Sequence, residues 1–400
     1  MRDSCFPLIS SDVYGYPKEE ALQVAVNEIG KFLLGHDMLV YIVVFDKDCF
    51  RVFCCTLCTT YMSGKQSFVF PENYGGINIE KYNAVIRNAA ESKNCNADYQ
   101  KYQLKLQIEK EKIFEQAART MTAEKVLIVC DRGTLDNQAY MNEVEFAEAM
   151  NFINSNEVEL RDNYDAVFHL VTAAKGAEEF YTTANNSART ETVAEATELD
   201  NRLISAWTGH PHLRVIDNSS FFEDKMKKLI AEISSCLGEP EPYEIERKYL
   251  IEYPDIKWLE GNSTCQRIEI IQTYLKSRSD EEMRVRQRGV DGHYIYLQTI
   301  KKKVSNLKRV EIERRLSQAE YLNLLMDADT SRKQIRKTRY CLTYKNQYFE
   351  IDIYPFWNDK AIAEIELSDE NAEIVFQKQI KVIKEVTDDD SYKNASLAKL

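Results

Sequence analysis

The sequence predicts two domains of different class, an α/β domain with a parallel sheet followed by a β-rich domain with an antiparallel sheet. The chain has 400 residues, which exceeds the roughly 100–200 residues of an ordinary domain. Short apolar runs alternate with long helical stretches in the first part, whereas apolar and charged residues alternate with a period of two in the second. The first pattern is typical of parallel strands joined by helices, and the second is typical of strands with one apolar face.

The boundary between the two domains is predicted at a short polar stretch that contains Pro240 and Pro242. This stretch follows an amphipathic helical run over residues 221–237, and proline cannot continue a helix. We therefore expect the first domain over residues 1–240 and the second over residues 241–400.

Composition and charge exclude several classes of protein. Hydrophobic residues make up 44% of the chain and charged residues 29%, which is typical of a folded, soluble protein. No apolar run reaches the ~18 residues of a membrane span, and the first residues show no signal-peptide pattern. The net charge of −12 lies in the first domain, which disfavours a nucleic-acid or membrane surface there. We therefore expect a cytoplasmic protein without a membrane partner.

Four apolar runs of the first domain are predicted as buried strands, and the amphipathic stretches between them as helices. The strands are expected at residues 39–45, 125–131, 165–172 and 213–217, and the helices at residues 82–90, 102–121, 140–153 and 192–207. Strands separated by crossover helices form a parallel, doubly wound sheet. Asp131 ends the second strand, at the edge where such sheets bind ligands, so it could hold a nucleotide-associated Mg²⁺ or simply cap the next turn.

Three segments of the first domain follow a recognisable pattern, and they are Tyr102–Gln107, Asp131–Gly133 and His212–Ser219. They resemble an AAA-type P-loop ATPase domain of the kind found fused to a CYTH domain, and the resemblance begins at about residue 50. Such a domain carries a Gly-x-x-x-x-Gly-Lys-Ser/Thr loop that binds phosphates, and this sequence contains no such string. Either the domain has lost nucleotide binding, with Asp131 as the remaining metal or nucleotide ligand, or the chain is a truncated form.

Charged residues occupy alternate positions in seven stretches of the second domain, beginning with Glu244, Glu246 and Lys248. Alternate residues of a strand share one face, so each stretch presents its charges together and turns its aliphatic residues the other way. The further stretches carry Arg284, Arg286 and Arg288; Lys301 and Lys303; Arg309, Glu311 and Glu313; Lys337 and Arg339; Glu350 and Asp352; Glu364 and Glu366. One such stretch is typical of a solvated outer face, but seven of them, with acids and bases sorted by strand, favour a uniformly charged cavity wall.

The composition of this wall predicts its ligand. Clustered Arg and Lys side chains bind a multiply charged anion with phosphate geometry. Clustered Glu and Asp side chains bind hard divalent cations through oxygen, and a cation that bridges carboxylate and phosphate oxygens satisfies both sets. We therefore expect a metal-bound oligophosphate in the cavity.

The opening pattern of the second domain, Glu244-x-Glu246-x-Lys248, matches a Glu-x-Glu-x-Lys signature, and the later charged stretches follow in the matching order. Over residues 243–397 the domain resembles the CYTH, or triphosphate tunnel metalloenzyme, superfamily. The resemblance implies an antiparallel eight-stranded tunnel with flanking helices. It also implies that the tunnel binds a triphosphate with Mg²⁺ or Mn²⁺ and hydrolyses the terminal phosphoanhydride bond.

The resemblance implies a role for each matched residue. Metal would be held by Glu244, Glu246, Glu311, Glu313, Asp352, Glu364 and Glu366. Phosphates would be bound by Arg284, Arg286, Lys301, Arg309, Lys337 and Arg339. Lys248 and Tyr274 would orient or deprotonate the attacking water, with phosphate binding as the alternative role of Lys248.

Three functions remain open from the sequence. A metal-dependent triphosphatase is favoured by the complete acidic set, because hydrolysis needs metal to offset charge and position water. A non-catalytic sensor or scaffold for polyphosphate would tolerate the loss of some carboxylates, and an adenylyl cyclase would need a site for adenine. Family members act on inorganic tripolyphosphate, thiamine triphosphate or RNA 5′-triphosphate, so the expected partner is a small-molecule triphosphate, with a triphosphorylated RNA end as the one nucleic-acid exception. The sequence indicates neither the substrate nor the oligomeric state.

Overall fold

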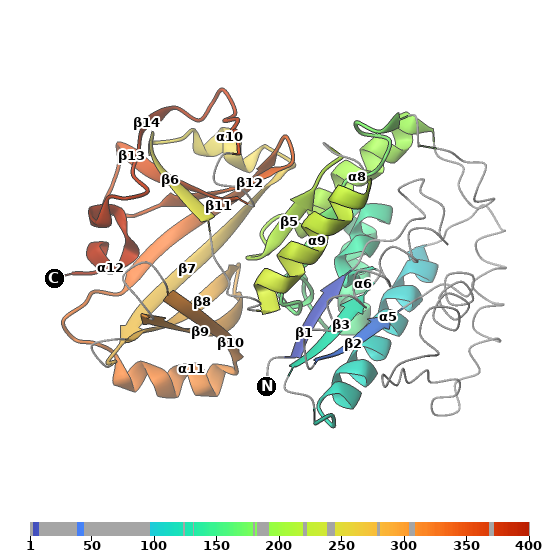
Figure 1. The fold of residues 1–400 in the computed structure, drawn as a ribbon, viewed down its shortest axis with the longest axis horizontal. Helices are drawn as coiled ribbons and strands as arrows, with labels where there is room; N and C mark the ends of the chain where they lie inside the picture. The colour runs from blue at the N-terminus through green and yellow to red at the C-terminus, as the bar shows by residue number, and fades with distance from the viewer. Residues whose placement is uncertain are drawn as a thin grey trace. The chain divides into compact units, whose positions relative to one another are not determined.

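A computed structural model of the chain describes the backbone of residues 3–7 and 38–43 and, with most side chains, residues 97–122, 125–130, 132–178, 181, 192–218, 222–237, 245–277, 281–303, 309–367 and 372–399. The chain divides into two compact units (Figure 1). The first unit comprises residues 1–155, 172–203 and 221–226, and the second unit comprises residues 156–171, 204–220 and 227–400. No helix in the described ranges is long and apolar enough to cross a membrane.

The first unit contains a parallel three-stranded sheet in the order β1-β3-β2. Its strands are β1 (Asp3–Pro7), β2 (Met38–Val43) and β3 (Lys125–Cys130). Its helices are α5 (Ala97–Ala118), the 3-10 helix η1 (Thr134–Tyr140), α6 (Glu143–Ile153) and most of α8 (Val193–Trp207). Asn142 and Glu145 begin α6 with a capping box, in which each side chain accepts a hydrogen bond from the other residue's backbone N–H.

A buried polar contact joins two of the segments that carry the AAA-type resemblance. Gln107 of α5 donates from Nε2 to the carbonyl oxygen of Arg132, 2.7 Å away, and its Oε1 accepts from Asn137 at 3.1 Å. Asp131 itself lies outside the described residues, so its role stays a prediction. The predicted helix over residues 82–90 also lies outside them.

Parallel pairing of the predicted strands is confirmed, whereas a single doubly wound sheet is not. β3 pairs in parallel with β1 and β2, but β4 (Val167–Leu170) and β5 (Leu213–Ile216) pair with each other in a separate two-stranded parallel sheet. In the described part of the chain, no ladder joins β3 to β4. Buried apolar runs predict strands but not their partners, so the pattern could not show that these strands form two sheets.

The second unit is built on a sheet of nine described strands, one more than the eight that the sequence predicts. The strand order is β10-β9-β8-β7-β11-β12-β13-β6-β14, and every neighbouring pair is antiparallel, as predicted. The strands are β6 (Ile245–Glu252), β7 (Cys265–Leu275), β8 (Glu281–Val290), β9 (His293–Lys303), β10 (Arg309–Leu316), β11 (Ile335–Tyr344), β12 (Gln347–Ile353), β13 (Lys360–Leu367) and β14 (Val382–Glu385). Within the described residues no ladder joins the end strands β10 and β14, so closure into a tunnel stays a prediction.

Two tight hairpins fix the register of the central strands. Asp291 and Gly292 join β8 to β9 with φ of 52° and 87°, and Lys345 and Asn346 join β11 to β12 with φ of 48° and 60°. Positive φ at both central residues is typical of the type I′ turn, whose twist matches that of antiparallel strands. A fixed register matters here because a slip of one residue would turn every charged side chain to the apolar face.

One face of the sheet carries the core of the second unit. Leu342, Ile351 and Ile365 are almost fully buried on β11, β12 and β13, and Leu259 of α10 (Ile256–Glu260) belongs to the same apolar cluster. These aliphatic residues alternate with charged ones, so the predicted period-two pattern is confirmed on these strands. The other described helices with residues in this unit are α7 (Glu157–Arg161), α9 (Phe222–Leu237), α11 (Gln318–Leu324) and α12 (Asn394–Leu397), with 3-10 turns at Leu325–Asp327 and Asp390–Tyr392.

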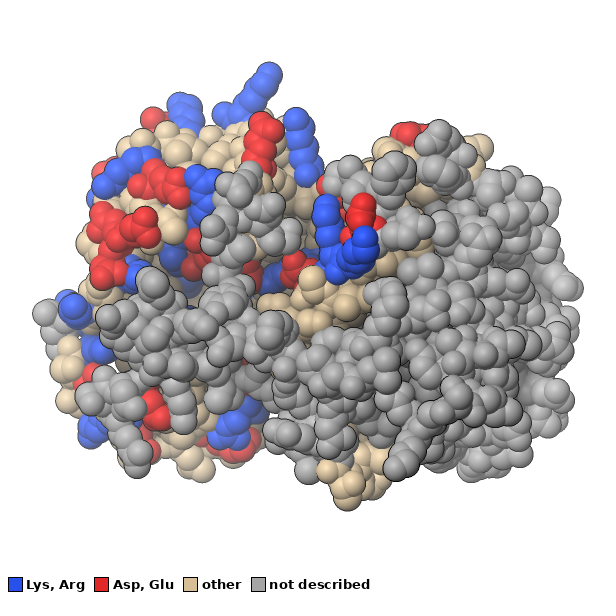
Figure 2. All heavy atoms as spheres, in the orientation of Figure 1, with Lys and Arg blue, Asp and Glu red and all other residues tan. Residues whose placement is uncertain are grey.

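The outer surface of the second unit shows little sorting of charge in the view of Figure 2. Basic and acidic side chains are interspersed there, as they are on ordinary soluble proteins. Sorted charge is instead found on one face of the sheet, where the candidate site lies.

Candidate active site

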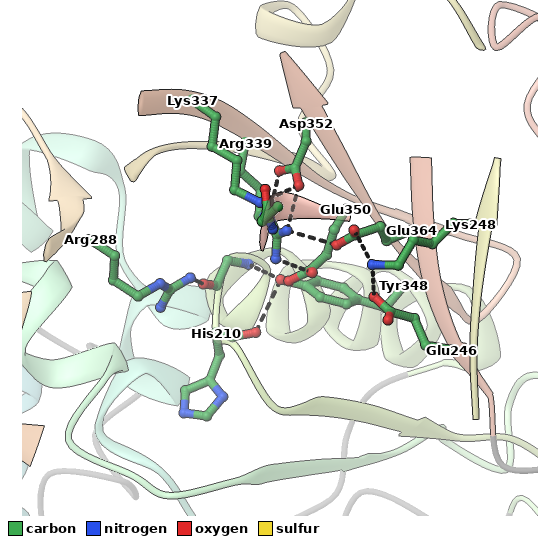
Figure 3. A network of polar contacts seen from close by, with 12 residues as sticks. His210, Glu246, Lys248, Arg288, Lys337, Arg339, Tyr348, Glu350, Asp352 and Glu364 are labelled. Carbon is green, nitrogen blue, oxygen red and sulfur yellow. Dashed lines mark hydrogen bonds and ion pairs between the residues drawn. The ribbon is translucent and has the colours of Figure 1, made fainter. Parts of the chain in front are cut away.

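Charged side chains gather on the sheet face opposite the core, on β11, β12, β13 and β6 (Figure 3). Arg339 of β11 is buried at their centre. Its Nε and Nη2 donate to the two oxygens of Asp352, each 2.6 Å away, and Nη2 also donates to Glu364 at 2.9 Å. Its Nη1 donates to Glu350. One guanidinium group therefore joins three carboxylates from two neighbouring strands.

Two lysines complete this arrangement. Lys248 of β6 donates to Glu246 at 3.0 Å and to Glu364 at 2.5 Å, and Lys337 of β11 donates to Asp352. The side chain of Asp352 is fully buried, and those of Lys337 and Glu364 are less than a tenth exposed. The name charged cluster is used below for Glu246, Lys248, Lys337, Arg339, Glu350, Asp352 and Glu364.

The register of the sheet explains why residues far apart in the sequence meet in this cluster. Arg339 is directly opposite Asp352, and Glu350 is directly opposite Glu364. Glu364 is in turn opposite Lys248 on β6. Directly opposite residues have Cβ atoms about 4.5–5.5 Å apart. The alternating charges of four strands therefore converge.

Burial and neighbouring charge shift the titration of the cluster in opposite directions. Burial opposes ionisation of Glu364, but Lys248 and Arg339 outweigh it and lower the pKa of this carboxyl group. Burial, together with the charge of Glu364, raises the pKa of Glu246 to about 7. Burial also lowers the pKa of Lys337, and the adjacent Arg339 adds to this effect. The pKa of Lys248 is raised, because Glu364 and Glu246 outweigh its burial. Of the two lysines, Lys337 is thus the one that gives up a proton more readily.

A second polar group lies on β8, β9 and β10. Arg286 donates from Nη2 to Thr299 Oγ1 at 3.1 Å and to Glu313, and Thr299 donates to Glu313 Oε2 at 2.9 Å. Burial opposes ionisation of Glu313, but Arg286 and His212 hold its pKa well below the usual range. The structure therefore brings together Arg286 and Glu313, two predicted site residues, with Thr299, which no charge pattern could indicate.

Tyr274 of β7 lies in an apolar cluster with Ile335, Tyr354 and Ile362. Its hydroxyl group is buried and has no hydrogen-bond partner of ordinary geometry in the described residues, and burial raises its pKa to about 12. Lys337 Nζ lies 5.8 Å from the ring centre of Tyr354. Tyr274 and Lys337 thus both lie close to Tyr354.

The other predicted residues are placed only by their strand positions. Arg284 is directly opposite Tyr274, and Lys301 of β9 is directly opposite Glu311 of β10. Only the backbone of Arg309 and Glu311 is described, and Glu244 lies outside the described residues. The predicted roles of these residues therefore stay predictions.

Arg288, the third arginine of the alternating stretch in β8, forms a buried ion pair with Asp162. It donates to Asp162 at 3.0 Å and to the carbonyl oxygen of Gly209 at 2.6 Å. Burial opposes ionisation of Asp162, but Arg288 outweighs it and lowers the pKa of the carboxyl group. The alternating pattern placed Arg288 on the charged face, but it could not indicate a partner 126 residues away in the sequence.

The charged face is not uniform, which corrects the sequence-based expectation. Ile268 and Ile270 of β7 are buried, and Ile268 is directly opposite Arg339. The charged residues of this part of β7, Arg267 and Glu269, alternate with them and form an ion pair at 2.6 Å on the other face. An apolar strand beside Arg339 keeps water from one side of the charged cluster and strengthens its ion pairs.

Comparison with known proteins identifies the second domain. Residues 242–391 match the CYTH domain family, and residues 74–225 match an AAA domain family. An inorganic triphosphatase of Acetivibrio thermocellus is 31% identical over 157 residues, which are 39% of this chain and 93% of that protein. The chain belongs to the CYTH family. An inorganic triphosphatase of Nitrosomonas europaea is 31% identical over 159 residues, 39% of this chain and 96% of that protein. A solved structure of an inorganic triphosphatase is 27% identical in sequence to this chain, with a TM-score of 0.28. The match covers 39% of this chain and 94% of the solved one.

The acidic residues of the CYTH domain suit a hard divalent cation. The charged cluster contains three cationic and four acidic side chains, so it is net negative when all are ionised. Glu246 and Glu366 are directly opposite each other on β6 and β13, where like charges repel unless a cation lies between them. Among the described residues, no three His, Cys, Asp or Glu side chains form a metal-binding group. This donor set fits Mg²⁺ or Mn²⁺, since such ions are commonly held by one or two carboxylates, with water and substrate phosphates as the other ligands.

Residues to which the sequence gave no role in the site also belong to it. Glu350 was visible in the alternating pattern beside Asp352, and its ion pair with Arg339 makes it part of the charged cluster. Arg214 Nη2 lies 2.5 Å from Glu366 Oε1, and His212 Nε2 lies 3.9 Å from Glu313 Oε1. Arg214 and His212 come from β5 and the turn before it, outside the nine-stranded sheet but within the second unit. No signal in the sequence connected them to the CYTH domain.

Proposed function

We propose that the CYTH domain hydrolyses the terminal phosphoanhydride bond of a linear triphosphate with a divalent metal, and that inorganic tripolyphosphate is its first candidate substrate. The observation that carries the proposal is the charged cluster, in which cations of β11 and β6 contact carboxylates of β12, β13 and β6. Two relatives named as inorganic triphosphatases support the substrate class.

Phosphate binding is assigned to the cationic side chains of this face. Arg339 and Arg286 present guanidinium groups, which bind phosphate oxygens in a bidentate manner. Both now pair with carboxylates. An entering triphosphate would exchange for part of these pairs, so the cations are already positioned when the anion arrives.

Metal binding is assigned to Glu246 and Glu366, which lie directly opposite each other on β6 and β13. Glu364 already accepts a hydrogen bond on each oxygen, from Lys248 and from Arg339, so its proposed part is to hold these two cations. Mg²⁺ or Mn²⁺ would neutralise phosphate charge and position the attacking water. Both oxygens of Asp352 accept hydrogen bonds from Arg339, so its proposed part is to hold the phosphate-binding cations rather than to contact the metal directly.

Proton acceptance fits Lys337 better than Lys248. A general base must be partly neutral near the working pH, and burial lowers the pKa of Lys337. The pKa of Lys248 is raised by the carboxylates it contacts. We therefore assign Lys248 to holding Glu246 and Glu364, and Lys337, with Tyr274 close by, to the attacking water.

Two alternatives remain for the same site. A non-catalytic polyphosphate sensor or scaffold would bind the same anion without turnover. An adenylyl cyclase would use the same metal and phosphate contacts but would release pyrophosphate and a cyclic nucleotide. The full set of described carboxylates favours hydrolysis over simple binding, because an anion sensor gains nothing from four acids beside its cations, two of them, Asp352 and Glu364, buried.

A substrate panel tests the proposal. The full chain is incubated with tripolyphosphate, thiamine triphosphate, ATP and pyrophosphate, each with Mg²⁺ and with Mn²⁺, and both phosphate and cyclic AMP are measured. We expect phosphate from tripolyphosphate, less from the organic triphosphates and no cyclic AMP. Tight binding of tripolyphosphate without any phosphate release would favour the sensor, and cyclic AMP from ATP would favour the cyclase.

The remaining assignments concern the chain as a whole. We propose a boundary near residue 240, a small-molecule partner and a cytoplasmic location. The first domain, which lacks a recognisable phosphate-binding loop, would then bind ATP weakly, because Asp131 alone offers no cradle of backbone amides.

A further inference from the structure

We propose that Arg214, on a strand outside the nine-stranded sheet, is a positioning residue that orients the carboxylate of Glu366 toward the divalent metal. The inference rests on the proposed function, because it takes Glu366 as a metal ligand. It adds a residue from the segment before the CYTH match to the machinery of the CYTH domain. The evidence comes from contacts within the second unit.

Arg214 is held between two carboxylates. Its Nη2 lies 2.5 Å from Glu366 Oε1, and its Nε lies 3.4 Å from Glu232 Oε2 on α9. The side chains of Arg214 and Glu232 are 17% and 18% exposed, so this guanidinium is largely removed from solvent. Two anchors fix a guanidinium group better than one, because its planar fork has a single orientation that serves both.

Glu366 needs such a partner more than the other acids of the site. It is directly opposite Glu246, and two like charges at opposite positions turn away from each other when nothing holds them. Its side chain is 30% exposed and could follow that repulsion into solvent. The closest contact of Arg214 is to Oε1, and the proposal takes Oε2 as the oxygen that faces the metal.

A second residue of the segment that carries Arg214 also contacts an acidic side chain of the sheet. His212, two residues before Arg214, lies 3.9 Å from Glu313, which also accepts hydrogen bonds from Arg286 and Thr299. One short segment thus contacts an acidic residue on β10 and another on β13, two strands far apart in the sheet order. The segment therefore contacts acidic residues of two strands that are not neighbours in the sheet.

Removing Arg214 would change the affinity for the divalent metal through two physical effects of opposite sign. Loss of a positive charge near the acids would strengthen their attraction for a cation. Loss of the outer contact that orients a ligating group typically weakens metal affinity by about 10–100-fold. The second effect is favoured because Glu232 already offsets part of the charge of Arg214, whereas Arg214 is the cation that contacts Glu366 in the described structure.

The test measures metal binding directly in the full chain. Mn²⁺ is titrated into wild type, Arg214→Ala, Arg214→Lys and Arg247→Ala, and free Mn²⁺ is followed by electron paramagnetic resonance. Arg247 is a matched control, because it pairs with Glu385 through two hydrogen bonds of 2.9 and 2.6 Å but occupies a position of β6 that alternates with Glu246 and Lys248. Melting temperatures are measured in parallel, and the Mn²⁺ activation constant for tripolyphosphate hydrolysis is compared with KM.

We expect Arg214→Ala to raise the dissociation constant for Mn²⁺ by about 10–100-fold, Arg214→Lys to raise it less, and Arg247→Ala to leave it unchanged. KM for tripolyphosphate at saturating Mn²⁺ should change little, which a general loss of structure would not produce. Wild-type affinity, or tighter binding, in Arg214→Ala would overturn the inference. If that variant does not fold, wild-type affinity in Arg214→Lys overturns it instead. Absence of Mn²⁺ binding by the wild type would defeat the proposed function itself, whereas Mn²⁺ binding that is equal in wild type and variants would defeat only the role of Arg214.

Discussion

Replacement of Arg339 by methionine tests the view that this residue holds the charged cluster together. The side chain of Arg339 is 11% exposed, and it donates to Asp352, Glu350 and Glu364. Methionine fills a similar volume but offers no donor and no charge. The variant therefore leaves three carboxylates on one sheet face with only Lys337 and Lys248 to compensate them.

The expected cost follows from the number of carboxylates that lose their partner. Removing one partner of a buried ion pair usually destabilises a protein by about 3–5 kcal/mol, and three carboxylates share this guanidinium. One kcal/mol shifts the melting temperature of a unit of 150–250 residues by about 2–4 °C. We therefore expect Arg339→Met to lower the melting temperature at pH 7 by roughly 6–20 °C.

The loss should depend on pH in a defined direction. Arg339 contributes to lowering the pKa of Glu364 in the folded wild type, so this carboxylate adds stability above its unfolded pKa and that stability is lost as the pH falls. In the variant, burial without the guanidinium raises the pKa of the same group. As the pH falls and Glu364 becomes protonated in the variant, the free energy of unfolding of the variant rises relative to that of the wild type. The difference in melting temperature between wild type and variant should therefore shrink from pH 7 to pH 4.5.

Thermal unfolding at the two pH values, followed by circular dichroism, measures both expectations. Arg336→Met is the matched control, because Arg336 lies on the same strand, is exposed and donates only to Gln334 at 3.0 Å in the described structure. It should change the melting temperature by no more than about 2 °C, as exposed substitutions usually do. A loss in Arg339→Met of less than about 3 °C at pH 7, or one that is the same at both pH values, would refute this reasoning.

Three further outcomes are expected. Arg286→Ala should raise KM for tripolyphosphate by about tenfold with little change in kcat, because Arg286 binds the anion; steady-state kinetics that show only a fall in kcat would contradict this. Lys337→Ala should lower kcat by about 10²–10⁴-fold and remove one limb of the pH–rate profile. Lys248→Ala should chiefly raise the metal concentration that activity needs. The reverse pattern would indicate that Lys248 is the general base. Burial lowers the pKa of His210 to about 3, below the unfolded value near 6.5, so the free energy of unfolding should fall by about 2 kcal/mol between pH 7 and pH 5. His210→Gln should reduce this dependence of stability on pH. An unchanged pH dependence in denaturant titrations of the variant would count against this role of His210.

The sequence predicted the charged face well because one rule connects pattern and structure. Side chains of a strand alternate between faces, so Glu364 and Glu366, or Lys337 and Arg339, could be assigned to one face without knowledge of their neighbours. Which charges meet across strands depends on register. The opposition of Arg339 and Asp352 therefore became known only from the structure.

Two features of the site could not be predicted by the same rule. β7 has charged residues at Arg267 and Glu269, but these alternate with Ile268, which faces the cluster. The rule says that two residues share a face, not which face it is. The contact of Arg214 with Glu366 could not be predicted for another reason. A contact between two separate segments leaves no periodic signal in the sequence of either segment.

In the predicted first domain, strands are present where the sequence predicts them, but in the described residues they do not form the single sheet that the sequence predicts. β3 and β4 are both short apolar runs with no feature that specifies a partner, and the structure places them in different sheets. The role of Asp131 depends on residues around it that the structure does not describe. Its proposed metal therefore stays a prediction from the sequence.

Metal-dependent hydrolysis by the CYTH domain is decided by phosphate release from tripolyphosphate by the full chain, with Mg²⁺ or Mn²⁺ and then with EDTA, beside the variant Glu246→Gln. We expect turnover by the wild type that requires the divalent metal and is abolished by EDTA. We also expect no turnover by Glu246→Gln, because the substitution removes a carboxylate assigned to the metal. Turnover that survives EDTA, or a fully active Glu246→Gln variant, would contradict this expectation.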